Sequence, residues 1–133
     1  MDLLSLRVLN WNACGLPGKK LEFIEFLKNQ HTDVAAITET HLKPDRNLSL
    51  PEHTIIRLDR EGSRGGGVAI AIRRGLVFRS LPSFRLRIIE AIGIEIITNS
   101  GPLNIITAYC PHQTKDSDGS TTFFRSDLSK LSN

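Results

Sequence analysis

Cysteine and long apolar runs are both scarce in this chain of 133 residues. The two cysteines, Cys14 and Cys110, cannot build a disulfide framework, so a reducing intracellular compartment is the expectation. No apolar run approaches the ~20 residues that cross a bilayer, and the first residues lack the basic and apolar parts of a secretory signal. We therefore predict an intracellular protein without membrane contact, with the nucleus as one candidate location and no targeting signal in view.

Motifs for zinc and nucleotide binding are missing as well. A structural zinc site needs about four nitrogen or sulfur ligands at tight spacings, whereas the two cysteines and four histidines are scattered singly. The turn at residues 15–20, Gly-Leu-Pro-Gly-Lys-Lys, matches neither GxxxxGK[ST] nor GxGxxG. We expect no nucleotide cofactor, and we interpret this turn as a connection between a strand and a helix.

The chain does contain a strand-helix-strand pattern followed by a series of strands. With 40% apolar and 23% charged residues it is typical of one globular domain. A helix is predicted at residues 19–30, where apolar side chains recur at helical spacing, and another from Thr121 onward. Strands are predicted at residues 6–12, 34–38, 53–58, 67–73, 76–80, 88–97 and 103–108. We place strands 6–12, 34–38 and 103–108 in one mixed sheet, with helix 19–30 over one face and the other face bare.

Polar side chains stand at or just after the ends of these three apolar strands. They are Asn12, Glu39 and Tyr109. The carboxyl ends of buried strands are where α/β enzymes place ligands, so the three together indicate a site for a hard cation and a phosphate. Each also has a plain interpretation: Asn12 as a turn residue, Glu39 as a solvated carboxylate and Tyr109 as a core aromatic.

Positive charge is concentrated between Arg57 and Arg87. Eight arginines and two acids give this arginine band a charge of +6, whereas the other residues, nine basic and twelve acidic, give −3. Arginine suits phosphate contacts, so the band predicts a nucleic-acid groove; a solvated strand face is the alternative. Within the band, the run Arg64-Gly65-Gly66-Gly67 is either a simple hairpin loop or a close approach to a phosphate chain, with Arg64 as the clamp.

Four motifs occur in a specific order along nearly the whole chain. They are LNWNACGL at residues 9–16, ITETHL at 37–42, RGGGVAI at 64–70 and TAYCP at 107–111. Together they resemble the endonuclease/exonuclease/phosphatase superfamily. The residues within the motifs are similar to those of the endonuclease domain of Jockey-like non-LTR retrotransposons. The resemblance implies an α/β fold, the amino-terminal half of a DNase I-like four-layer sandwich, with a mixed β-sheet and covering helices.

The resemblance also implies an activity and roles for particular residues. It implies that Glu39 is a Mg²⁺ ligand (Mn²⁺ as an alternative), that Asn12 positions the metal and the phosphate, and that Tyr109 contacts the phosphate. These three are the predicted catalytic residues, and the substrate is double-stranded DNA. For nucleic-acid contacts we predict Arg64, Arg60 and Thr40.

Several positions depart from the family pattern. Cys14 stands where relatives carry an acid or amide, and a thiol is a poor Mg²⁺ partner; His112 replaces a usual Asn. No later Gly-Asp-Phe-Asn strand or Ser-Asp-His motif follows Tyr109, so the general base is missing. We therefore expect residues 1–133 to form a partial domain of a Mg²⁺-dependent DNA-nicking phosphodiesterase, inactive as this fragment. The alternative is a non-catalytic remnant that binds nucleic acid through the arginine band.

Overall fold

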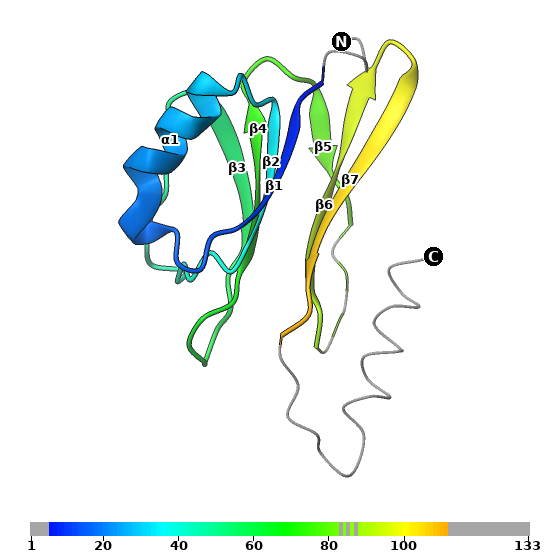
Figure 1. Ribbon diagram of the computed structural model, residues 1–133. Helices are drawn as coiled ribbons and strands as arrows, with labels where there is room; N and C mark the ends of the chain where they lie inside the picture. Colours follow the sequence, from blue (N-terminus) through cyan, green and yellow to red (C-terminus); the bar gives the residue numbers. More distant parts are fainter. Residues whose placement is uncertain (1–5, 83, 85, 87, 112–133) are drawn as a thin grey trace.

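The computed structural model describes residues 6–82, 84, 86 and 88–111 of the chain (Figure 1). Seven strands, one α-helix and one short 3-10 turn make up this part of the chain. In chain order they are β1 (Val8–Asn12), η2 (Pro17–Lys19), α1 (Lys20–Asn29), β2 (Val34–Thr38), β3 (His53–Leu58), β4 (Val68–Arg73), β5 (Phe78–Ser80), β6 (Glu90–Thr98) and β7 (Gly101–Tyr109). The predicted helix after Thr121 lies outside the described residues.

A first sheet contains four strands in the order β1-β2-β4-β3. β1 and β2 are parallel neighbours joined through α1, which confirms the predicted strand-helix-strand unit, while β4 is antiparallel to both β2 and β3. The first four residues of β2 and the first five of β4 are all buried, as expected for central strands covered on both faces.

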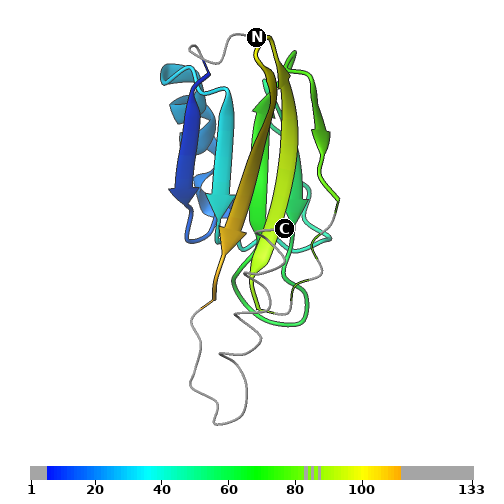
Figure 2. The same cartoon turned by 90° about the vertical axis from the view of Figure 1, so that its right-hand side faces the viewer.

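A second, antiparallel sheet in the order β5-β6-β7 packs on the face of the first sheet opposite α1. Figures 1 and 2 show the resulting layers: helix, first sheet, second sheet. Ile94 and Ile96 of β6 point inward and form one core cluster with Val34, Ile70 and Ile72 of the first sheet. Their neighbours Glu95 and Ile97 face outward, as the two-residue period of a strand requires.

The layered α/β architecture is therefore as predicted, but one strand assignment is wrong. Residues 103–108 belong to β7 in the second sheet, not beside β1 and β2. The second face of the first sheet is consequently covered by the second sheet, mainly over β2, β4 and β3. The prediction failed because the apolar pattern of a strand does not indicate which sheet the strand joins. Only α1 covers the first sheet as a full helix among the described residues.

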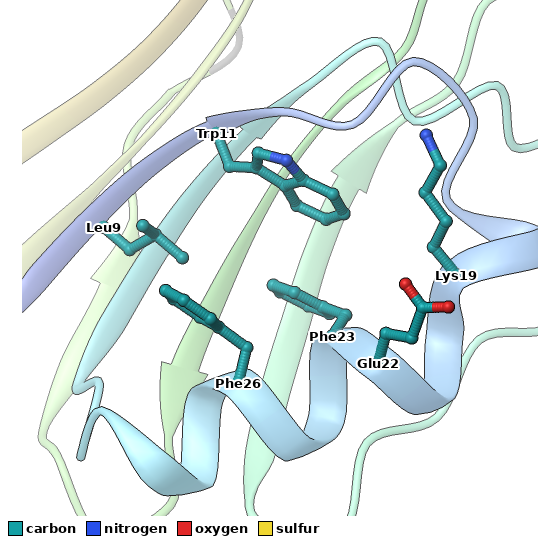
Figure 3. A pocket seen from close by; sticks show the side chains of 6 residues that line it. All are labelled: Leu9, Trp11, Lys19, Glu22, Phe23 and Phe26. Carbon is teal, nitrogen blue, oxygen red and sulfur yellow. The ribbon is translucent and has the colours of Figure 1, made fainter.

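The helix layer is built from aromatic side chains resting on small ones. Phe23 and Leu27 are the buried residues of α1, and Phe23 stacks on Trp11 of β1 with ring centroids 5.2 Å apart (Figure 3). Ala35, Ala69 and Ala71 provide the flat surface of the sheet in the same core cluster. No helix in the described part of the chain is long and apolar enough to cross a membrane.

Candidate metal and phosphate site

Strands from both sheets bring their ends together at one end of the sandwich. β1 and β2 both finish there, because they are parallel and Asn12 lies beside Thr38. The antiparallel β4 begins there, with Val68 opposite Thr38. In the second sheet, β6 begins at Glu90, which pairs with Tyr109 at the end of β7. The turns that follow or precede these residues therefore share one surface.

Glu39 and Tyr109, predicted to lie together, are in direct contact. The Tyr109 hydroxyl donates a hydrogen bond to Glu39 Oε1 at 3.0 Å, across the two sheets. Burial, then this hydrogen bond and the negative charge of Glu39, raise the pKa of Tyr109 above its ordinary value. The phenol therefore keeps its proton at neutral pH and remains a donor. Their proposed roles toward a metal and a phosphate remain predictions.

The turn that carries Glu39 has an uncommon backbone. Glu39 and His41 have φ of 51° and 57°, in the left-handed region that L residues with a side chain rarely adopt. Backbone hydrogen bonds hold this turn on two sides: Gly15 donates to the Glu39 carbonyl at 3.0 Å, and His41 donates to the Gly66 carbonyl at 2.8 Å. A strained conformation enforced by its neighbours is common where a side chain must be aimed.

Thr40 lies inside this turn, not on its surface. The residue is 0% exposed, its amide donates to the Gly67 carbonyl at 3.1 Å, and its Oγ1 accepts from the Leu42 amide at 3.3 Å. A Cβ atom at Gly67 would collide with Thr40 Oγ1, which explains the glycine at that position. The predicted nucleic-acid contact of Thr40 disagrees with this burial, so Thr40 is a structural residue of the turn.

Asn12 organises the neighbouring turn after β1. Its Oδ1 accepts a hydrogen bond from the Cys14 amide at 3.1 Å, which agrees with its plain interpretation as a turn residue. Lys19 closes the same turn, because its Nζ donates to the carbonyls of Ala13 at 2.5 Å and Cys14 at 3.3 Å. Cys14 is exposed at φ 47°. A role of Asn12 toward a metal remains a prediction.

Arg60, predicted to contact nucleic acid, is engaged within the protein. Its guanidinium donates to both oxygens of Glu90, each at 3.1 Å, and its Nη1 donates to the Arg64 carbonyl at 3.0 Å. The side chains of Arg60 and Glu90 are only 22% and 15% exposed. Because its charge is matched by Glu90 and it is mostly buried, Arg60 is not an open phosphate-binding cation in this structure. Arg64 itself is exposed at the tip of the loop.

The arginine band does not form one surface. Arg73, at the far end of β4, is paired with Asp33 at 2.6 Å, on the opposite end of the sandwich from Glu39. The remaining ion pairs in the band are Arg57 with Asp59 at 2.7 Å and Arg79 with Glu95 at 2.9 Å. Arg85 and Arg87 lie outside the described residues. The described residues of the arginine band therefore do not form a continuous positively charged groove.

Two residues that take part in this arrangement were not predicted from the sequence. Glu90 accepts both from Arg60 and from the Gly67 amide, the latter at 3.2 Å, and Lys19 ties down the first turn. Sequence reasoning looked for polar residues at the carboxyl ends of strands, whereas Glu90 begins a strand. The available signal was an acid at the first position of a strand rich in isoleucine, although Glu95 lies in the same strand.

The donors fit a hard cation that needs few protein ligands. Within residues 6–82, 84, 86 and 88–111, no three His, Cys, Asp or Glu side chains gather in a way that would enclose a metal. Magnesium accepts one carboxylate and keeps several waters, so the Glu39 carboxylate suits it, and Asn12 ends the strand beside the one that leads to Glu39. A soft or tightly caged metal does not suit this set.

The chain belongs to the endonuclease/exonuclease/phosphatase family, because residues 9–131 match the model of that family. This is a family of nucleases and other hydrolases of phosphate esters. The resemblance of the four motifs is thereby confirmed.

Relatives include mobile-element proteins of Drosophila melanogaster. The chain is 29% identical over 111 residues to a probable RNA-directed DNA polymerase from transposon X-element, and 26% identical over 108 residues to the RNA-directed DNA polymerase from mobile element jockey. These alignments cover 82% and 80% of this chain but only 12% of each relative.

Solved structures share the fold at low sequence identity. The endonuclease domain of TRAS1, a telomere-specific non-LTR retrotransposon, superposes with a TM-score of 0.66 at 16% identity, over 95% of this chain and 53% of that one. The catalytic domain of Xenopus laevis APE2 gives 0.69 at 12%, over 93% and 51%. The chain thus spans about half the length of these domains, in agreement with the predicted half of a DNase I-like fold.

Proposed function

We propose that this chain carries the metal- and phosphate-binding part of a Mg²⁺-dependent phosphodiesterase that nicks double-stranded DNA. The observation that supports it best is the 3.0 Å contact between Tyr109 Oη and Glu39 Oε1 at the shared end of both sheets. It brings together a carboxylate for a hard cation and a neutral phenol whose single O–H donates to that carboxylate here and, once the carboxylate holds a cation, is available to a phosphate oxygen.

In this proposal the residues of the chain bind and orient. Glu39 and Asn12 hold the metal, which when bound would neutralise charge on the phosphate and lower the pKa of a water. Tyr109 orients the Glu39 carboxylate through its one hydrogen bond, and once that carboxylate holds the metal the same O–H would turn to a phosphate oxygen. Arg64, which is exposed on the adjacent loop, would contact the DNA backbone.

Metal binding is testable on the chain itself. Mn²⁺, a paramagnetic substitute for Mg²⁺, should broaden the NMR signals of residues around Glu39 before any others. Glu39→Gln should remove this broadening, because the amide keeps the size of the side chain but loses the charge that attracts the cation. Glu25→Gln, at an exposed carboxylate on α1, is the matched control and should leave it unchanged. Broadening that survives Glu39→Gln would refute the assignment.

We further propose that the 133-residue chain does not nick DNA alone. Its sequence shows no match to the family's Asp–His pair, which activates the attacking water. Supercoiled plasmid incubated with the chain and Mg²⁺ should therefore stay intact. Mg²⁺-dependent conversion to the open circle, lost in Glu39→Gln, would contradict inactivity while supporting the metal site.

The non-catalytic remnant that binds nucleic acid through the arginine band has less support. Four of the six described arginines in the band are in ion pairs with protein carboxylates.

A further inference from the structure

The Glu39 turn depends on a loop that belongs to another part of the first sheet. The amides of Thr40 and His41 donate to the carbonyls of Gly67 and Gly66, so this glycine loop forms one wall of the turn. Non-glycine residues in the left-handed region are strained and persist only where the surrounding structure over-determines them. Whatever fixes the glycine loop therefore also fixes the backbone of the turn from which the Glu39 side chain extends.

The glycine loop is in turn held by the Arg60–Glu90 pair. Arg60 binds the Arg64 carbonyl at one end of the loop, and Glu90 Oε1 accepts from the Gly67 amide at the other. The guanidinium lies so close to Gly66 that a Cβ atom there would collide with it. The two hydrogen bonds between Arg60 and Glu90, both 3.1 Å, complete this clamp.

The clamp also spans the two sheets at the place where Glu39 meets Tyr109. Arg60 follows β3 of the first sheet, whereas Glu90 begins β6 of the second and is the cross-strand partner of Tyr109. One ion pair therefore fixes both halves of the Glu39–Tyr109 contact: the turn carrying the carboxylate and the strand end carrying the phenol.

We propose that Arg60 and Glu90 are positioning residues that align Glu39 with Tyr109, and that Arg60 acts through Glu90 and not by touching phosphate. The proposal rests on the proposed function for its purpose, but the alignment itself can be observed without metal or DNA. It reassigns Arg60 from a substrate contact to an internal one, as expected for a charge that is matched and mostly buried.

The test uses Glu90→Ala and Arg60→Met in the full 133-residue chain. In each variant the nuclear Overhauser effect between the Tyr109 ring and the Glu39 side chain should be lost. Amide hydrogen exchange at Thr40 and His41 should accelerate by about tenfold or more, because hydrogen bonds to charged groups are among the stronger ones. Amides of the central strand β4 should exchange as in the wild type, which separates a local effect from unfolding.

Two further variants make the test specific. Glu95→Ala breaks the Arg79–Glu95 pair, which is also an arginine–glutamate pair with two hydrogen bonds but lies away from the turn; it should change neither readout. Glu90→Gln retains one acceptor oxygen, which can still receive the Gly67 amide and Arg60 Nη2 but not Arg60 Nε, so it should restore part of the Tyr109–Glu39 effect. That rescue is not expected of a residue that merely adds stability.

The outcomes separate this proposal from the proposed function. If Glu90→Ala keeps the Tyr109–Glu39 effect and normal exchange at Thr40 and His41, positioning is overturned. Positioning is also overturned if Arg60→Met keeps the Tyr109–Glu39 nuclear Overhauser effect but reduces the log–log salt slope of DNA binding by about one, the change expected for one lost phosphate contact. If the wild-type chain binds no Mn²⁺ near Glu39, the proposed function fails while these readouts still decide the alignment. Where Mn²⁺ does bind, broadening near Glu39 should fall severalfold in Glu90→Ala and not in Glu95→Ala.

Discussion

Backbone strain next to Glu39 makes single glycines important at the residue scale. Gly67 has φ 89°, and Thr40 Oγ1 occupies the space of a Cβ atom, so Gly67→Ala combines an unfavourable backbone with a collision. We expect Gly67→Ala to lower the free energy of unfolding by about 1–3 kcal/mol. Gly62→Ala is the control, because Gly62 has φ 79° with open space around it. This variant should lower the free energy of unfolding by less, since only the unfavourable backbone conformation contributes. Denaturant unfolding followed by the fluorescence of Trp11, the one tryptophan, would compare the two; equal losses would mean that Thr40 moves aside easily.

The single tyrosine gives a second residue-scale prediction. Burial first, and then the hydrogen bond to Glu39, raise the pKa of Tyr109. Since the folded pKa lies above the unfolded one, neutral Tyr109 stabilises the fold below pH about 10, and this contribution is lost as pH rises through the folded pKa. Absorbance at the phenolate band should therefore show ionisation above the ordinary range. Glu39→Gln should lower this pKa partway, because burial remains; no change would argue against the contact.

At the scale of elements, the two-sheet packing separates neighbouring residues of β6. Ile94 is fully buried between the sheets, whereas Ile97, on the outer face, is 48% exposed. Ile94→Ala should lower the free energy of unfolding by about 2–5 kcal/mol, through lost burial and the cavity left behind. Ile97→Ala should cost well under half as much. Similar losses from both variants would indicate that the second sheet does not cover the first as described.

For the whole molecule, the divided arginine band predicts where duplex DNA is contacted. Arg64 is exposed at the Glu39 end, and Arg74 is exposed at the far end. Arg64→Ala should weaken binding and reduce the log–log salt slope by about one, since one phosphate contact is lost. Arg74→Ala removes the same charge but should leave the slope unchanged. Equal effects of the two variants would favour diffuse attraction by net charge.

Local pattern alone determined which segments become strands and helix. Residues 34–38 and 53–58 were predicted with the observed limits, because a two-residue apolar period or a short apolar run is read directly from neighbours along the chain. The meeting of Glu39 and Tyr109 was also predicted, but for one shared sheet, whereas the contact forms between the ends of strands in two packed sheets. The family followed from four ordered motifs, and the family match confirms it.

The tertiary structure alone decided which sheet β7 joins, and which arginines have partners. Pairing between strands depends on surfaces brought together across the fold, so an apolar strand such as residues 103–108 is compatible with either sheet. Likewise Arg60 and Glu90 are 30 residues apart, and nothing local distinguishes this arginine from Arg64, which stays exposed. A sequence records charge and periodicity, whereas neutralisation and burial depend on distances that exist only once the two sheets have packed.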